Sequence, residues 1–249
     1  MGAIALYNRP SPNHADKVSQ ALALLRQLAS LHPRLIQASS LGAEDMVVTH
    51  LIHLAGIDCG VFVLDTGKLH TETLALIGLI EQRYHRSVEV YRPRQESMLR
   101  FVRLQGEDAM YRSTELRKQC CDIRKMEPLS RALAGKNGWI TGLRREQSAA
   151  RAGVAAVVQE PERVKISPIV EWTWGDVWHF IARHQVPYNA LHDQFFPSIG
   201  CAPCTRAIAV GEDFRAGRWW WEQESAKECG LHVQPFPAQN NPPVESNAR

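Results

Sequence analysis

Hydrophobic residues recur along the chain with two different periods. In residues 16–31 they return every three or four positions, which places Val18, Leu22 and Leu25 on one face of an amphipathic helix. Residues 60–64 (GVFVL) instead form a continuous apolar run, typical of a strand buried on both faces of a parallel sheet. The same reasoning predicts further strands at residues 34–39, 87–91 and 139–143, and further helices near residues 44–54, 70–84, 123–134 and 174–184.

The alternation of strands and helices predicts an α/β fold with a doubly wound, mainly parallel sheet. Ligands of such sheets bind where the strands end, here at residues 39–42, 65–67 and 142–145. The pattern changes beyond residue 172, where prolines and three consecutive tryptophans appear. We therefore predict one α/β domain over residues 1–210 and a C-terminal segment over residues 211–249 with a polar, proline-rich tail.

Composition narrows the class of protein. The 249 residues are 45% hydrophobic and 22% charged, as in an ordinary globular chain. No apolar run reaches the roughly 18 residues of a membrane span, and the N-terminus lacks the features of a signal peptide, so we expect a cytoplasmic protein without membrane contact. The net charge of +3 gives no reason to expect nucleic acid as a partner.

Three strand-end loops carry groups that suit an anionic nucleotide. Ser39 and Gly42 precede a helix start, where backbone N–H groups favour an anion. Asp65, followed by Gly67, can accept a hydrogen bond from a ribose hydroxyl or an adenine amino group, and Arg144 begins a cluster of donors. Each loop alone has an ordinary alternative, namely a strand-to-helix turn, a helix cap or a solvated surface turn.

Six cysteines are the most specific chemical signal. The pairs Cys120–Cys121 and Cys201–Cys204 supply four thiolates, enough for structural zinc or for an iron–sulfur cluster. Adjacent cysteines bind one small ion poorly, whereas a 4Fe–4S cluster offers separate irons. Its negative charge would also be offset by flanking cations at residues 117, 118, 124, 125 and 206. The cluster is therefore favoured, while zinc and unligated buried thiols remain alternatives.

The other cysteines and two arginines have separate predicted roles. Cys229 stands alone near the C-terminus with His232 three residues on, which makes it a candidate nucleophile. Cys59 lies between apolar stretches and is expected to pack in the core. Arg215 and Arg218 are close enough in sequence to face one anion.

Taken together, these motifs resemble a known family. Cys120–Cys121-x-x-Arg124–Lys125, Gly200–Cys201-x-Pro203–Cys204, the segment at residues 217–221 and Glu228–Cys229–Gly230–Leu231–His232 resemble the iron–sulfur branch of the phosphoadenylyl-sulfate reductase family, the assimilatory adenylyl-sulfate reductases. The loops at residues 42–45, 64–67 and 144–148 fit its nucleotide loops. The resemblance covers about residues 35–232, and the cysteine pattern is its most specific part.

The resemblance implies an adenine-nucleotide α-hydrolase-like fold and a set of residue roles. A 4Fe–4S cluster would be held by the four paired cysteines, and Lys125 would lie between cluster and substrate. Adenosine 5′-phosphosulfate would be contacted by Ser39, Gly42, Asp65, Gly67, Arg144, Arg215 and Arg218. Leu41 departs from the family, because relatives commonly carry a polar residue there.

The implied reaction is a thiol-dependent reduction in sulfate assimilation and cysteine biosynthesis. Cys229 would attack the sulfate sulfur, expel AMP and become S-sulfocysteine, with His232 nearby. Thioredoxin, or a glutaredoxin-like reductant, would then release sulfite. We also expect a homo-oligomer. The alternatives are a reductase of the 3′-phosphorylated substrate and a redox-sensing iron–sulfur or zinc protein without catalysis, in which Cys229 would have no role.

Overall fold

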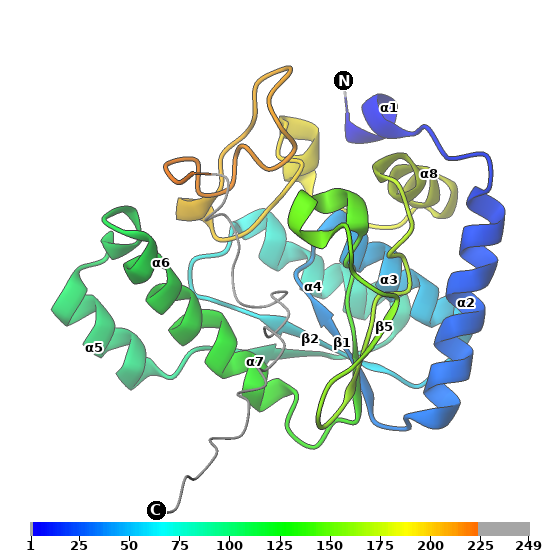
Figure 1. Cartoon of the computed structure of the whole chain (residues 1–249), viewed down its shortest axis with the longest axis horizontal. Coiled ribbons are helices and arrows are strands. Elements are labelled where there is room, and N and C mark those ends of the chain that lie inside the picture. Colours follow the sequence, from blue (N-terminus) through cyan, green and yellow to red (C-terminus); the bar gives the residue numbers. More distant parts are fainter. Residues whose placement is uncertain (1, 224–249) are drawn as a thin grey trace, which may run out of the picture.

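A six-stranded sheet forms the centre of the molecule (Figure 1). In the computed structural model, which describes residues 2–223, the strand order is β3-β2-β1-β4-β6-β5. All neighbouring strands are parallel except β5 and β6, which are antiparallel. The strands span Leu35–Ser39 (β1), Gly60–Leu64 (β2), Val88–Tyr91 (β3), Gly138–Ile140 (β4), Val157–Gln159 (β5) and Val164–Ile166 (β6). The predicted fold class is confirmed.

Helices cover both faces of this sheet because side chains alternate along its strands. Val61 and Val63 of β2 belong to the larger core, shared with α2 (His14–Leu31), α3 (Ala43–Ala55), α4 (Thr71–Tyr84) and α8 (Trp174–His184). Phe62 points to the opposite face, where it packs with Ile36 and with Leu129 of α7 (Glu127–Ala132). Both faces are therefore buried, which explains the continuous apolar run in β2.

Most of the predicted elements lie where the sequence pattern indicated, and several others are added. The structure also contains α1 (Ala3–Tyr7), α5 (Gln95–Gln105) and the strands β5 and β6. Met98, Phe101 and Val102 of α5 have the spacing of an amphipathic helix, so the sequence held a usable signal that the prediction missed, although Phe101 is the one buried residue of this helix. The strands β5 and β6 have three residues each, too few to show an alternation.

The predicted helix at residues 123–134 is part of a longer helical segment. It starts with α6 (Thr114–Cys121), passes through a π-helical stretch at Asp122–Met126 and continues as α7. Ser113 caps its start, because its side chain accepts a hydrogen bond from the backbone N–H of Leu116. Single π-helical turns inside α-helices are frequent at functional sites, and this one carries Lys125.

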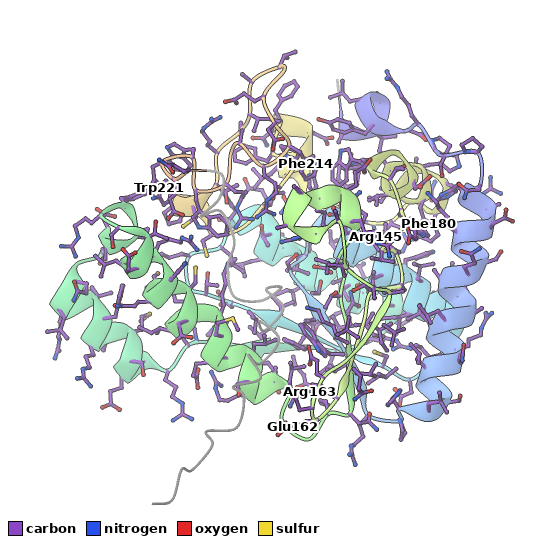
Figure 2. All side chains as sticks on the ribbon, in the orientation of Figure 1. Arg145, Glu162, Arg163, Phe180, Phe214 and Trp221 are labelled. Atoms are coloured by element: carbon purple, nitrogen blue, oxygen red, sulfur yellow. The ribbon has the colours of Figure 1, made fainter. Side chains whose placement is uncertain are left out.

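Residues 211–223 lie against the carboxyl end of the sheet rather than apart from it. Phe214 packs edge-on against Trp174 at the start of α8, with ring centroids 4.9 Å apart, and Figure 2 labels Phe214 and Trp221 on this segment. The domain boundary at residue 210 stays a prediction. Cys229 and His232 lie outside the described residues. Among residues 2–223, no helix is long and apolar enough to cross a membrane.

Candidate functional site

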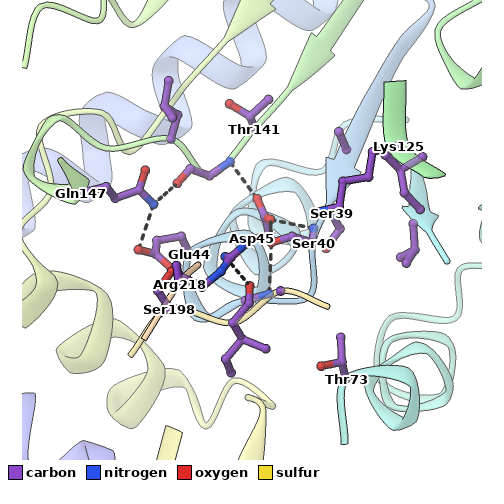
Figure 3. Close-up of a pocket in the computed structure, with 18 of the residues that line it drawn as sticks. Ser39, Ser40, Glu44, Asp45, Thr73, Lys125, Thr141, Gln147, Ser198 and Arg218 are labelled. Carbon is purple, nitrogen blue, oxygen red and sulfur yellow. Dashed lines mark hydrogen bonds between the residues drawn. The ribbon is translucent and has the colours of Figure 1, made fainter. Parts of the chain in front are cut away.

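A cavity of about 200 Å³ opens at the carboxyl ends of β1, β2 and β4. The strand order reverses direction between β1 and β4, and the crevice at such a switch point is where open α/β sheets bind ligands. Ser39 ends β1, and Thr66 and Thr141 follow β2 and β4. All three line the cavity, which we call the strand-end pocket, and Figure 3 labels Ser39 and Thr141. Its location is the one predicted from the sequence.

The loop between β1 and α3 is held by a buried carboxylate. Asp45 accepts hydrogen bonds from the backbone N–H and the hydroxyl of Ser40, at 2.7 and 2.6 Å, and from the backbone N–H of Gly142, at 2.8 Å (Figure 3). A Cβ at Gly142 would lie 2.5 Å from this carboxylate, so a side chain there would separate the two loops. The Asp45 carboxylate therefore ties the β1 loop to the β4 loop.

Leu41 does not reach the pocket. Its φ of 61° is in the left-handed region, and its side chain is fully buried in the larger core. The loop thus offers Ser39, Ser40 and Gly42 to the pocket, while Leu41 anchors the loop from behind. The departure from the family pattern removes no pocket-lining side chain.

Glu44 brings a second carboxylate into the pocket wall. Arg144 donates to it through Nε and Nη2, at 3.2 and 3.0 Å, and Gln147 donates through Nε2, at 3.0 Å. Burial alone would raise the pKa of Glu44, but Arg144 and the hydrogen bond from Gln147 outweigh burial and lower it. Glu44 is consequently an anion inside the pocket.

Arg144 itself does not line the pocket. It is 1% exposed, pairs also with Glu146 at 2.7 Å, and donates to the Trp172 carbonyl. Its guanidinium lies 5.3 Å from the ring centroid of Trp174. The residue predicted to bind the nucleotide directly therefore positions Glu44.

The loop after β2 is closed by Asp65. One carboxylate oxygen accepts from the Gly67 backbone N–H at 3.0 Å, and the other accepts from Arg92 Nε at 2.9 Å. Gly67 has a φ of 70°, and the guanidinium of Arg124 passes 3.5 Å from the position a Cβ would take. Neither Asp65 nor Gly67 lines the pocket, whereas Thr66 between them does.

Four cations line the pocket, namely Lys125, Arg151, Arg215 and Arg218, and the three arginines among them are more than 90% buried. Arg218 stacks over the Trp219 ring at 4.6 Å and would clash with any side chain at Gly200, since a Cβ there would lie 2.4 Å from Nη2. Arg215 and Arg218 thus both line the pocket, while their joint contact with an anion stays a prediction, and the positive charges of this wall suit a multiply charged anion.

The four paired cysteines line a second, smaller cavity. Cys120 and Cys121 come from the end of α6, and Cys201 and Cys204 from the turn at residues 201–204. Burial, together with the nearby Cys201 and Cys121, raises the pKa of Cys204 to about 12. Burial also raises the pKa of Cys120. Within residues 2–223, no three His, Cys, Asp or Glu side chains converge closely enough to hold one metal ion.

The loop with Cys201 and Cys204 is fixed on both sides. The Ala202 N–H donates to the Lys68 carbonyl at 2.7 Å, and Thr66 Oγ1 lies 3.2 Å from Cys201 Sγ. On the other side, the Trp219 N–H donates to the Cys204 carbonyl at 3.2 Å. The loop is therefore positioned by the end of β2 and by the tryptophan segment together.

The strand-end pocket and the cysteine cavity share a wall. Lys125 and Trp219 line both of them. The cysteine cavity is otherwise lined by further cationic side chains, namely Lys68, Arg117 and Arg124. A group held by the four cysteines would accordingly be separated from a ligand in the strand-end pocket by one lysine and one indole ring.

Some pocket residues were not singled out from the sequence. Arg151 and His192 are both buried and line the pocket. Arg151 follows the predicted donor loop by only three residues, so the clustering of arginines there was a usable signal. His192 is a single histidine in a short 3-10 helix, and no motif around it points to a binding role.

Comparison with known proteins places this geometry in context. Residues 34–207 match the family described as "Phosphoadenosine phosphosulfate reductase domain". The chain is 49% identical over 233 residues to the adenosine 5′-phosphosulfate reductase of Burkholderia cepacia, covering 92% of this chain and 93% of that one. It is 50% identical over 218 residues to the protein of the same name from Allochromatium vinosum, covering 87% of this chain and 85% of that one.

The fold is shared with solved structures as well. The phosphoadenylyl-sulfate reductase from Candida auris, a phosphate complex, superposes with a TM-score of 0.64 at 25% identity, covering 76% of this chain and 90% of that one. The FMN adenylyltransferase of Candida glabrata, solved with FAD and pyrophosphate, has a TM-score of 0.54 at 11% identity, a likeness of fold alone.

Proposed function

Because the chain belongs to the phosphoadenosine phosphosulfate reductase domain family, we propose that it reduces adenosine 5′-phosphosulfate to sulfite and AMP. The names of its relatives at 49% and 50% identity support this substrate. The observation that carries the proposal is the wall of Lys125 and Trp219, which joins the strand-end pocket to a cavity lined by four cysteines. A non-catalytic metal-binding protein would have no use for such a shared wall.

The donor set of the cysteine cavity fits a 4Fe–4S cluster. It would be held by Cys120, Cys121, Cys201 and Cys204. These four soft thiolates surround a cavity, which suits a cluster of several irons better than a single metal ion. When bound, the cluster would supply a compact group of negative charge beside the pocket. Lys68, Arg117 and Arg124 would balance that charge, since they line the same cavity.

The cations of the pocket have a defined task in the reaction. A thiolate attacking the phosphosulfate approaches a group that already carries negative charge. Lys125, Arg215 and Arg218 reduce that repulsion and stabilise the charge that builds up on the leaving phosphate oxygen. Fixed, buried donors do this without reorganising during the reaction, and both arginines are buried.

The chemical steps balance with Cys229 as nucleophile. Its thiolate forms a bond to the sulfate sulfur, the bond from sulfur to the phosphate oxygen breaks, and AMP leaves with that electron pair. A dithiol reductant of the thioredoxin class then attacks Cys229 Sγ and releases sulfite. Its second thiol restores the Cys229 thiol, and the reductant leaves as a disulfide. His232 would stabilise the Cys229 thiolate.

Glu44 favours the substrate without a 3′-phosphate. Its carboxylate is an anion within the pocket because Arg144 and Gln147 hold it in that form. A nucleotide with an additional phosphate near this carboxylate would be repelled, whereas a ribose hydroxyl could donate to it. This supports adenosine 5′-phosphosulfate over the 3′-phosphorylated nucleotide. The homo-oligomer, the cytoplasmic location and the role in cysteine biosynthesis stay predictions.

The proposal is tested with purified protein, a dithiol reductant and each nucleotide. We expect sulfite and AMP from adenosine 5′-phosphosulfate, and far slower turnover of the 3′-phosphorylated form. Without reductant, mass spectrometry should find an added SO₃ group on Cys229. Equal or faster use of the 3′-phosphorylated nucleotide would overturn the substrate assignment, and an unmodified Cys229 in protein that turns over would overturn the covalent step.

A further inference from the structure

His192 is a buried histidine in the wall of the strand-end pocket. His192 is 4% exposed, and neither of its ring nitrogens makes a hydrogen bond to any residue in the range 2–223. The Phe196 carbonyl lies close enough to raise the pKa of the ring without meeting hydrogen-bond geometry. A buried polar group without a hydrogen-bond partner destabilises a protein, so the place of His192 in a pocket wall calls for a ligand.

The ring is held rigidly by its surroundings. It packs edge-on against Trp178 and Trp174, with centroids 5.3 and 6.0 Å apart. The backbone N–H of His192 donates to the Asn189 carbonyl at 3.0 Å. Asn189 is itself anchored, since its side chain donates to Thr73 Oγ1 at 2.8 Å. The imidazole is therefore preorganised as a contact for something in the pocket.

The ring is also neutral. Burial lowers the pKa of His192 to about 4, and the opposing effects of Glu44, the Phe196 carbonyl and Asp193 are smaller. A neutral imidazole presents one N–H donor and one lone-pair acceptor. It therefore suits an uncharged group that can both donate and accept, such as a hydroxyl, better than it suits a phosphate.

Cationic side chains border the cysteine cavity at one end of the pocket, where Lys125 lines both cavities and Arg218 stacks over Trp219 of their shared wall. At the other end the acids Glu44 and Asp193 act on His192, and Arg151 donates to Gln147 beside Glu44. The phosphosulfate belongs at the cationic end, and the apolar wall of Phe62, Leu129 and Trp139 suits the flat adenine ring. The sugar hydroxyls are left for the end with Glu44 and His192.

We propose that His192 hydrogen-bonds a ribose hydroxyl of the nucleotide and, with Glu44, forms the sugar subsite of the pocket. This rests on the proposed function, since it takes the ligand to be an adenine nucleotide. His192 is thereby a substrate-binding residue for the reaction, placed 37 residues before the proposed nucleophile and outside every motif of the sequence.

The test measures binding of AMP, 2′-deoxy-AMP and 3′-deoxy-AMP by titration calorimetry. On the unmodified protein we expect one deoxy nucleotide to bind about tenfold more weakly than AMP, the usual effect of one lost hydrogen bond in a buried site. His192→Phe should bind AMP and that deoxy nucleotide equally. His192→Asn, which keeps polar atoms, should recover part of the difference.

His50→Phe is the matched control. His50 is also buried, and burial lowers its pKa to about 4 as well, but it lies outside the pocket lining. It should leave the preference for AMP unchanged. Inosine 5′-monophosphate differs from AMP only in the base, which the proposal places away from His192. His192→Phe should therefore change the affinity for both nucleotides by the same factor.

Two results would overturn the subsite. One is equal binding of all three nucleotides by the unmodified protein, a result that needs no variant. The other is a full preference for AMP that persists in His192→Phe. Either result with normal sulfite release would leave the proposed function intact. Failure to bind AMP and to release sulfite would instead reject the proposed function itself.

Discussion

The guanidinium of Arg117 and the carboxylate of Glu222 form a bidentate ion pair in the protein interior. Nε donates to Oε1 at 2.9 Å and Nη2 donates to Oε2 at 2.8 Å, with 0% and 4% of the two side chains exposed. The same guanidinium lies 4.5 Å from the ring centroid of Trp219. One arginine of α6 thus fastens the C-terminal tryptophan segment over the cysteine cavity.

Breaking this pair should be costly. Glu222→Gln leaves a buried arginine without its carboxylate, and removal of one partner of a buried pair costs about 3–5 kcal/mol. Denaturant unfolding measures the loss. The control is Glu212→Gln, which removes a pair with Arg206 that is one-third exposed on both sides and is worth about 1 kcal/mol or less. Equal losses in the two variants would contradict the structural role given to Arg117.

Replacement of single cysteines should separate the proposed cluster ligands from the cysteine of the core, because only the former should reduce the iron content. Cys120→Ala is expected to lose most of the iron from an anaerobically purified protein, which should contain about four irons per chain. Cys59→Ala should keep its iron, because Cys59 packs in the core at 1% exposure, away from the cysteine cavity. Iron assay and the visible absorption spectrum report the outcome. A colourless unmodified protein with one zinc would refute the cluster.

Burial should also make Cys59 chemically inert. Burial raises its pKa to about 12, so almost no thiolate exists near neutral pH. An alkylating reagent should therefore leave Cys59 unlabelled in the folded protein and label it after unfolding, which peptide mass spectrometry detects. Labelling of Cys59 in the folded state at the rate of an exposed thiol would contradict this.

The bounds of helices and strands were predicted most accurately from the sequence where a single local apolar pattern determines them. The strand at residues 60–64 and the helix at residues 174–184 match β2 and α8 to the residue, since the apolar patterns end sharply. Cys59 is buried as predicted. The helix α5 was missed although Met98, Phe101 and Val102 recur at helical spacing.

The roles of single charged residues were harder to predict, because their partners lie far away in the sequence. Arg144 is predicted to contact the nucleotide, and that contact stays a prediction. Its partner Glu44 is 100 residues away, and only the folded sheet brings the β1 and β4 loops together. His192 had no pattern around it. Its importance arises from burial and missing hydrogen-bond partners, which are properties of the fold.

Low pH should lower the free energy of unfolding because it protonates Asp176. Burial alone would raise the pKa of this carboxyl, but hydrogen bonds from Lys17, Thr173 and Ser11 outweigh it and hold the pKa well below its usual range. A lowered folded-state pKa contributes stability above the unfolded value of about 3.9, and that contribution is lost as pH falls below it.

The stability difference between the unmodified protein and Asp176→Asn should accordingly be large at pH 7 and shrink steadily below about pH 4. Denaturant unfolding across pH 3–7 tests this. Asp16→Asn, an exposed carboxylate of α2, should show a small and nearly constant difference. A difference for Asp176→Asn that grows on acidification would have the wrong sign.

Lys125 should affect the chemical step more than folding. Lys125→Gln removes the positive charge between the pocket and the cysteine cavity, and loss of one such electrostatic donor lowers kcat by about 10²–10³-fold. Thermal unfolding should change little. The control is Lys118→Gln on the exposed face of α6, which lies in neither cavity. Equal activity of the two variants would exclude a catalytic role for Lys125.

Glu44 should determine how strongly the protein rejects a 3′-phosphate. Glu44→Gln removes the negative charge of the pocket wall, so we expect the ratio of kcat/KM for adenosine 5′-phosphosulfate over the 3′-phosphorylated nucleotide to fall about tenfold, which corresponds to about 1.4 kcal/mol. Glu146→Gln is the matched control, because Glu146 also pairs with Arg144 but is half exposed and lies outside the pocket lining.

The two variants separate charge repulsion from a mere loss of order around Arg144. Both remove one carboxylate partner of the same guanidinium, so disorder of Arg144 would alter the substrate ratio in both. Repulsion by a carboxylate inside the pocket alters it in Glu44→Gln alone. A selectivity unchanged in Glu44→Gln would mean that the 3′-position is excluded by the shape of the wall instead, with Ser39 and Gly42 as the nearest elements to vary next.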